Sequence, residues 1–256
     1  MPTLTLLTDF GLDDYYVAAV KGVILSRAPG TTLVDISHTV PPGDIAAGAF
    51  LLRAAVPWFP EGAVHLAVVD PGVGSARRLL VVETARGLLV GPDNGLLTPF
   101  FPGSTVRSVT LTELFLKGPG DTFHGRDRFA PVAAALLSGV AAASLGPEIG
   151  DPMRLPVDEP SREPGRLAGT VIHVDRFGNL VTDLPTAWLP AGVSFRAEVA
   201  GRSTGVYATH YAQIPAGEPA LLPGSLGTLE LALANGDLAS AWGVGRGTPV
   251  VLVWEE

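Results

Sequence analysis

Acidic and basic side chains that could carry out proton transfer flank one glycine-rich turn. The apolar run AVHLAVV ends at Asp70, and the stretch VVDPGVGSARR then brings Arg77 and Arg78 after a turn that contains Gly72 and Gly74. A carboxylate can accept a proton, and a guanidinium can orient that carboxylate through paired hydrogen bonds. The turn would fold the chain back, so that an arginine seven residues later reaches Asp70. The alternative is that Asp70 merely caps the turn through its own side chain.

A second polar stretch, GDTFHGRDRFAP (120–131), precedes an apolar helical pattern. His124 stands between Phe123 and Gly125, and a glycine lets the backbone approach another group closely. We therefore expect a functional role for His124. For the charged residues 126–128 that follow it, the expectation is an ion-paired helix start.

Two further polar residues follow apolar runs, Asp9 after TLTLLT and His38 after TTLVDIS. In open α/β sheets, ligands bind beyond the carboxyl ends of the strands, where these side chains and Asp70 would meet. Asp9 could instead belong to a helix-capping network with the acidic pair 13–14, and His38 fits either role. His65 lies in mid-strand and is expected to be a core or interface histidine.

The elements that must position these residues form two regions. Residues 1–150 alternate short apolar β-rich runs with helical patterns, which predicts a mostly parallel, Rossmann-like α/β/α sheet domain. Residues 151–166 belong to the proline-rich segment PEIGDPMRLPVDEPSREPGR and are expected to form a linker. Residues 167–256 contain short alternating strands separated by turn residues, typical of a smaller antiparallel β-barrel or sandwich domain.

Composition excludes several classes of protein. The chain of 256 residues is 47% hydrophobic and has a net charge of -8, with no Lys/Arg run, so a nucleic-acid partner is not expected. With no cysteine, disulfides and thiolate sites are excluded. The signatures GxGxxG, GxxxxGK[ST], GxSxG and HExxH are absent. No signal peptide or membrane span is recognised, which predicts a cytoplasmic protein. The scarcity of Asn, Gln and Met, with arginine far more frequent than lysine, suggests a thermophile.

Seven motifs occur in a fixed order: TDFGLDDYYVAAVKG, DISHTVPPGD, VVDPGVGSARR, GPDNGLL, TFHGRDRFAP, VDRFGNLVTD and PGSLGTLELA. Together they resemble the S-adenosyl-L-methionine (SAM) hydrolases that form adenosine, also called SAM hydroxide adenosyltransferases. That family is related to the SAM-dependent fluorinase and chlorinase. The resemblance covers nearly the whole chain, including the break between the two regions.

The resemblance implies a role for particular residues. Asp70, Arg77 and His124 would form a triad around a water next to C5′ of SAM, although Arg78 remains an alternative for the arginine. Asp9 would bind both ribose hydroxyls. The remaining contacts lie in the second region: Phe177, Asn179 and Tyr211 at adenine, and Asp175 and Ser225 near the methionine end. For Asn179, an ordinary turn role remains an equal alternative.

The implied reaction is hydrolysis of SAM to adenosine and L-methionine by in-line attack of an activated water at C5′. Methionine leaves the sulfonium as a neutral thioether, so no metal or other cofactor is expected. The family also implies a homotrimer, with SAM between the large domain of one chain and the small domain of its neighbour. Two alternatives stay open: a SAM or adenosine sensor without turnover, and a metal-dependent phosphohydrolase built from TDFGLDD, His38, Asp70 and His124.

Overall fold

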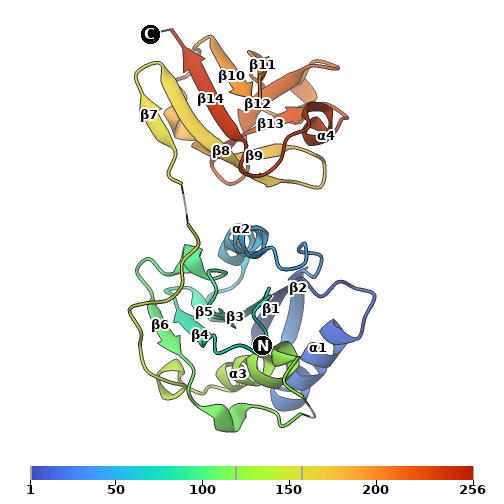
Figure 1. The fold of residues 1–256 in the computed structure, drawn as a ribbon, viewed down its shortest axis with the longest axis vertical. Coiled ribbons are helices and arrows are strands. Elements are labelled where there is room, and N and C mark those ends of the chain that lie inside the picture. Colours follow the sequence, from blue (N-terminus) through green and yellow to red (C-terminus); the bar gives the residue numbers. More distant parts are fainter. Residues whose placement is uncertain (1, 119, 157, 256) are drawn as a thin grey trace. The chain divides into compact units, whose positions relative to one another are not determined.

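The computed structural model describes residues 2–118, 120–156 and 158–255. The chain forms two compact units, Met1–Pro156 and Val157–Glu256 (Figure 1). No helix in the described part of the chain is both long and apolar enough to cross a membrane.

Unit 1 is built on one six-stranded sheet with the order β2-β1-β3-β5-β4-β6. β1, β2, β3 and β5 run parallel, whereas β4 is antiparallel to both of its neighbours. The strands are β1 Thr3–Thr8, β2 Thr32–Ser37, β3 Ala63–Val68, β4 Leu79–Glu83, β5 Gly87–Pro92 and β6 Thr105–Ser108. The helices are α1 Tyr16–Arg27, α2 Ile45–Ala55 and α3 Ala130–Leu137, with short helical turns η1 Val56–Trp58, η2 Thr98–Phe100, η3 Thr112–Leu114, η4 Gly125–Phe129 and η5 Ala142–Ser144.

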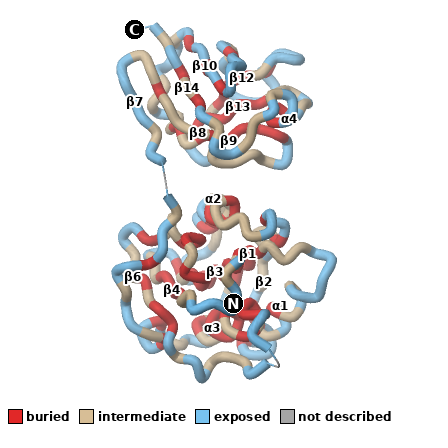
Figure 2. Tube along the Cα trace, viewed as in Figure 1, coloured by how far each residue is buried: buried red, intermediate tan, exposed pale blue. Residues whose placement is uncertain are grey.

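Helices cover both faces of this sheet. Alternate strand residues point to opposite faces, so Leu4 and Leu6 of β1 share a buried cluster with α1 and α3, whereas Leu7 packs with α2. The inner strands β1, β3, β4 and β5 are therefore buried along most of their length, whereas the edge strand β2 has no buried residue (Figure 2). The predicted α/β/α domain with a mostly parallel sheet is confirmed, and the near-continuous apolar runs reflect burial on both faces.

The parallel strands β1, β2 and β3 end at the same edge of the sheet, where Asp9, His38 and Asp70 follow them. The π-helical turn η4, directly before α3, lies close to the residues that follow β1 at this edge. A Cβ added to Gly125 would be 3.0 Å from the Phe10 ring. The close backbone approach expected at Gly125 therefore occurs, and Phe10 is its partner. Such π-helical turns frequently accompany functional sites.

Unit 2 is an antiparallel, nearly closed barrel-like sheet with the order β11-β10-β14-β8-β9-β13-β12, and β7 pairs with β8. The bridge Tyr207↔Leu221 brings the chain after β11 against β12, so the two ends of this order meet. The predicted smaller antiparallel domain, a barrel or a sandwich, is confirmed, and it is barrel-like. Its elements are β7 Ser161–Glu163, β8 Arg166–Val174, β9 Leu180–Pro185, β10 Phe195–Val199, β11 Arg202–Thr204, β12 Pro219–Pro223, β13 Thr228–Leu233, β14 Pro249–Trp254, α4 Leu238–Trp242, η6 Thr186–Trp188 and η7 Tyr211–Gln213.

Much of the range 151–166, expected to be a linker, is held by one unit or the other. In unit 1, the Met153 amide donates to Asp93 Oδ1 (2.7 Å) and the Leu155 amide to Thr98 Oγ1 (2.9 Å). In unit 2, residues 161–163 form β7. The prolines mark an extended chain, but the neighbouring amides still find acceptors on each unit, which leaves a far shorter connection than expected.

Candidate functional site

Asp70 and Arg77 form a paired hydrogen bond at the carboxyl end of β3. Arg77 Nε donates to Asp70 Oδ1 at 2.6 Å, and Arg77 Nη2 donates to Asp70 Oδ2. Both side chains are largely buried, and the guanidinium lies 5.0 Å from the centre of the Phe129 ring. Ion pairs of this bidentate type are strong and directional. The glycine turn therefore returns the chain onto the strand-end carboxylate, and Asp70 is more than a turn cap.

His124 extends this pair into a cluster. Its Nδ1 lies 2.8 Å from Arg77 Nη2, and its Nε2 lies 2.8 Å from Asp121 Oδ1. A guanidinium can only donate, so Nδ1 accepts and carries no proton, and Nε2–H donates to Asp121. Burial lowers the pKa of His124, and the charges of Arg128 and Arg77 lower it further, while Asp121 acts in the opposite direction. His124 is therefore held as the neutral tautomer protonated on Nε2.

Asp121 was not singled out from the sequence. It precedes His124 by three residues, and its Oδ1 also accepts from Arg128 Nη2 at 2.6 Å. The stretch GDTFHGRDR did contain a sign of this contact, because an acidic side chain lies three residues, or about one helical turn, before the imidazole. The ion-paired helix start expected at residues 126–128 is also found, since Arg126 binds Asp127 (2.7 Å).

Arg78 belongs to a different contact. Its Nε donates to Asp93 Oδ2 at 2.6 Å, and its Nη1 donates to Asp151 Oδ1 at 2.8 Å. These bonds attach the chain before the second unit to the sheet edge. Of the two adjacent arginines, the structure therefore brings Arg77 to Asp70 and His124.

Asp9 follows β1 and accepts a hydrogen bond from the Gly43 amide at 2.8 Å. It does not cap α1, because the residue before that helix is Tyr15 and no side chain caps it. One amide contact leaves lone pairs of the Asp9 carboxylate for a ligand at the strand ends.

The other two histidines considered in unit 1 are turned into the protein. His38 is buried, and its Nδ1 lies 2.8 Å from Thr8 Oγ1. His65 is 1% exposed, its Nδ1 lies 2.8 Å from Thr5 Oγ1, and burial lowers its pKa to about 4. The expectation of a core histidine at position 65 is confirmed.

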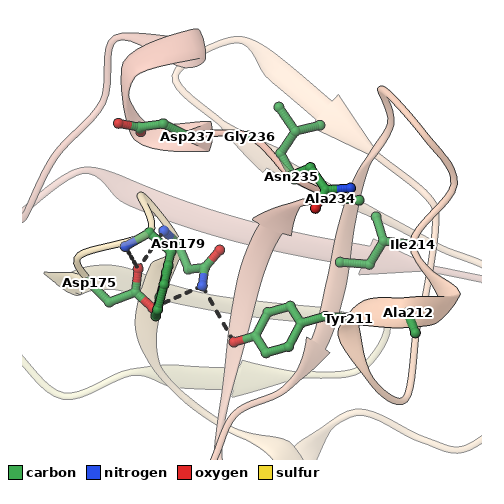
Figure 3. Close-up of a pocket in the computed structure, with 11 residues that line it drawn as sticks. Asp175, Asn179, Tyr211, Ala212, Ile214, Ala234, Asn235, Gly236 and Asp237 are labelled. Carbon is green, nitrogen blue, oxygen red and sulfur yellow. Dashed lines mark hydrogen bonds between the residues drawn. The ribbon is translucent and has the colours of Figure 1, made fainter.

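Unit 2 carries a pocket of about 850 Å³. Residues from the turn after β8, from η7 and from the end of β13 and the turn after it line the pocket and are drawn in Figure 3: Asp175, Phe177, Asn179, Tyr211, Ala212, Ile214, Leu233, Ala234, Asn235, Gly236 and Asp237. Four residues assigned from the resemblance thus share one pocket. No sequence pattern pointed to the turn 234–237, which follows β13 and also lines the pocket. None of the described lining residues is Lys or Arg, so the lining charges are carboxylates.

The turn between β8 and β9 is organised by Asp175. Its Oδ1 accepts from the amides of Phe177 (2.8 Å) and Asn179 (2.9 Å), and its Oδ2 accepts from Asn179 Nδ2 (2.9 Å). The Phe177 side chain is left 74% exposed beside the pocket. Asn179 does make the turn contacts of an ordinary turn asparagine, but its buried amide also lines the pocket (Figure 3).

Tyr211 connects this turn to a buried carboxyl group. Asn179 Nδ2 donates to the Tyr211 hydroxyl at 3.4 Å, and that hydroxyl donates to Glu230 Oε1. Burial and the neighbouring Glu230 raise the pKa of Tyr211, so it stays protonated and can donate. Glu230 was missed in the sequence because it lies within the alternating strand TLELAL, whose pattern alone does not show what faces it.

Ser225 lies outside this pocket. It is exposed in the turn that joins β12 to β13 and is not among the lining residues. Among the described residues, no group of three or more His, Cys, Asp or Glu side chains is arranged to hold a metal ion.

Two family models match most of the chain. The SAM hydroxide adenosyltransferase N-terminal domain matches residues 4–146, and the C-terminal domain of the same family matches residues 169–251. A relative from Thermus thermophilus, named (R)-S-adenosyl-L-methionine hydrolase, is 44% identical over 96% of this chain and 98% of its own. Its source fits the thermophilic composition noted above. A fluorinase from Actinoplanes sp. is more distant, with 27% identity over 98% of this chain and 97% of its own.

The fold is also shared with solved structures. The crystal structure of an uncharacterized conserved protein from Thermotoga maritima is similar with a TM-score of 0.92 and 33% sequence identity, covering 98% of this chain and 99% of that one. The Thermus relative and the Thermotoga structure are thus similar to this chain over nearly all of its length.

Proposed function

The chain belongs to the SAM hydroxide adenosyltransferase family, and from this membership we propose that it hydrolyses SAM to adenosine and L-methionine. It is an enzyme that acts on SAM, as its relatives are. The proposed hydrolysis rests on one structural observation, the cluster of Asp70, Arg77 and His124 at the strand ends of unit 1. Asp70 and Arg77 meet there with His124, which lies 47 positions after Arg77, in one hydrogen-bonded unit.

The reaction replaces the C5′–S bond of SAM by a C5′–O bond to water. Methionine leaves as a neutral thioether with the bonding electron pair, and the attacking water gives up one proton. Because charge is neutralised as a hydroxide-like oxygen approaches a sulfonium, a water-poor site favours the step. The task of the protein is therefore to hold the water in line with the C5′–S bond and to accept its proton.

Asp70 is suited to accept that proton. Arg77 occupies one lone-pair direction on each carboxylate oxygen, and an ionised carboxylate has about four such directions, so a water can still donate to it. Arg77 fixes the orientation of the carboxylate. His124 accepts a hydrogen bond from the same guanidinium through its unprotonated Nδ1, and so helps to hold Arg77 against Asp70.

The substrate-binding part of the proposal concerns Asp9 and the pocket of unit 2. Asp9 would bind the ribose hydroxyls through its remaining lone pairs. The exposed ring of Phe177 would stack on adenine, with Asn179 and Tyr211 at the base. Asp175 would face the methionine end, where a carboxylate suits a cationic ligand such as SAM. Ser225 would contact the same end, a role that rests on the resemblance.

A homotrimer is also part of the proposal, with the unit 1 cluster of one chain and the unit 2 pocket of its neighbour completing each site. A closed ring of identical head-to-tail contacts would give three equivalent sites. We further propose that the enzyme acts in the cytoplasm and without a metal or other cofactor.

The test is incubation with SAM in ¹⁸O-labelled water, with and without EDTA, followed by chromatography and mass spectrometry. We expect adenosine and L-methionine in equal amounts, one heavy oxygen in the adenosine 5′-hydroxyl, and no effect of EDTA. Asp70→Asn should lower turnover at least about a hundredfold. Recovery of intact SAM would indicate a sensor, and activity lost to EDTA and restored by a divalent metal would contradict the mechanism.

A further inference from the structure

We propose that Asp121 is a positioning residue for His124: its carboxylate holds Nε2–H, so that the Nδ1 lone pair stays directed at Arg77, which in turn binds Asp70. This inference rests on the proposed function, because it gives a task to a group behind the catalytic cluster. Neither the resemblance nor the sequence patterns assigned Asp121 a role.

The contacts form one continuous chain of hydrogen bonds. It runs from Asp70 through Arg77 and His124 to Asp121, whose Oδ1 accepts from both His124 Nε2 (2.8 Å) and Arg128 Nη2 (2.6 Å). The imidazole is 1% exposed, whereas the Asp121 side chain is 65% exposed. Among the described residues, Asp121 is therefore the group that joins the buried imidazole to the protein surface.

The segment that carries Asp121 lies against the loop that carries Arg77. A Cβ added to Gly74, whose φ is +83°, would come within 3.5 Å of the Asp121 carbonyl oxygen. The turn in VVDPGVGSARR thus brings Arg77 to Asp70 and also lies against the backbone of Asp121. A carboxylate held in this way is placed to keep its partner in a fixed orientation.

The tautomer explains why this contact matters. If Nδ1 carried the proton instead, an N–H of His124 would face an N–H of Arg77 at 2.8 Å, and Nε2 would need a donor that a carboxylate cannot supply. Arg77 and Asp121 thus select the same tautomer from opposite sides. A protonated Nδ1 would lose the hydrogen bond from Arg77, so a neutral His124 held by Asp121 keeps Arg77 paired with Asp70, the proton acceptor of the proposed reaction.

The alternative is that Asp121 only forms an exposed ion pair with Arg128. Such pairs contribute little to stability, and their loss would leave His124 unchanged. The charged groups that act on His124 are Arg77 from the loop after β3, Asp121 from the segment before η4, and Arg128 from η4. Removing Asp121 alone therefore separates the two interpretations.

The experiment compares Asp121→Ala, Asp121→Asn and the wild type, with Asp151→Asn as control. Asp151 is likewise an exposed aspartate of unit 1 bound to an arginine, but it lies outside the cluster. Long-range ¹H–¹⁵N NMR spectra of the free protein report the His124 tautomer, and steady-state kinetics report kcat and KM separately. We expect Asp121→Ala to add the Nδ1–H tautomer or exchange broadening at His124, and to lower kcat about tenfold with KM for SAM within about twofold.

Asp121→Asn keeps an acceptor for Nε2–H, so it should restore the wild-type tautomer and part of kcat. The control should match the wild type in both measurements. A folded Asp121→Ala variant with wild-type tautomer and kcat would overturn the inference, while SAM hydrolysis by the wild type would still stand. If the wild type itself fails to turn over SAM, the proposed function is wrong, and the NMR comparison still decides whether Asp121 sets the tautomer.

Discussion

Arg77 Nη2 lies 2.8 Å from His124 Nδ1, and because a guanidinium is a donor only, the imidazole must offer it an unprotonated nitrogen. This relationship places a neutral histidine beside an ion pair in a buried cluster. It also means that the Nδ1 lone pair is occupied by Arg77, which in turn orients the Asp70 carboxylate. The consequences can be measured on single residues.

Replacing Arg77 by lysine should lower kcat at least about a hundredfold. Lysine presents a single ammonium group and cannot form the paired bonds to Asp70 while also contacting His124. Arg78→Lys is the matched control, since it changes the adjacent arginine, which binds Asp93 and Asp151 instead. We expect it to keep kcat within about threefold of the wild type in steady-state assays. Equal losses in both variants would contradict the assignment of Arg77.

In Arg128→Gln, the acid limb of the pH–rate profile should shift to higher pH. The pKa of His124 lies below its ordinary value near 6.5, first because of burial and then because of the charges of Arg128 and Arg77. Turnover needs the unprotonated Nδ1, so activity falls as pH decreases through this pKa. Removing the Arg128 charge raises the pKa, and the fall then begins at higher pH. The measurement is kcat/KM between pH 4 and 9, and a limb that stays in place or moves to lower pH would refute it.

Phe177→Ala should weaken binding of adenosine about tenfold without loss of thermal stability. The ring is 74% exposed, so it stabilises the fold little and is available for stacking on a purine. Calorimetric titration with adenosine gives the Kd. Trp58→Ala removes an aromatic side chain that is 82% exposed in unit 1, and it should leave the Kd unchanged. If Phe177→Ala binds adenosine as tightly as the wild type, the base lies elsewhere.

The free energy of unfolding should fall as pH decreases from about 6.5 to about 4. The pKa of His65 is lowered to about 4 by burial, so in this range the unfolded chain binds a proton that the folded chain does not. The loss reaches about 3 kcal/mol at the lower end. Urea unfolding of the wild type and His65→Gln at several pH values tests this, because the variant should lose that part of the slope. His210→Gln, at an exposed position, should change the free energy by less than about 0.5 kcal/mol at any one pH.

Mixing two inactive variants should restore activity if sites are shared between chains. Asp70→Asn is defective in unit 1, and the double variant Phe177→Ala/Asn179→Ala is defective in unit 2. After denaturation and joint refolding, some neighbouring chains would pair an intact unit 1 with an intact unit 2. Size-exclusion chromatography with light scattering checks for a trimer. Mixed trimers that remain as inactive as their parents would show that each site belongs to one chain.

The sequence alone determined the class of fold and the region of the site. Apolar runs that end at Asp9 and Asp70 predict parallel strands with polar side chains at one edge, because the hydrophobic pattern and the turn residues are local properties of the chain. The ordered motifs likewise indicated the family. The alternating strands of residues 167–256 predicted an antiparallel barrel or sandwich for the same local reason.

Only the tertiary structure decided which side chains act together. Arg77 and Arg78 are adjacent and lead into β4, where successive side chains point in opposite directions, so one reaches Asp70 and the other Asp93. The contact of Arg77 with His124 joins residues 47 positions apart, and it depends on the packing of α3 and its π-helical turn against the sheet. The hydrogen bond between Tyr211 and the buried Glu230, which lie 19 positions apart, is likewise a consequence of packing that no local pattern specifies.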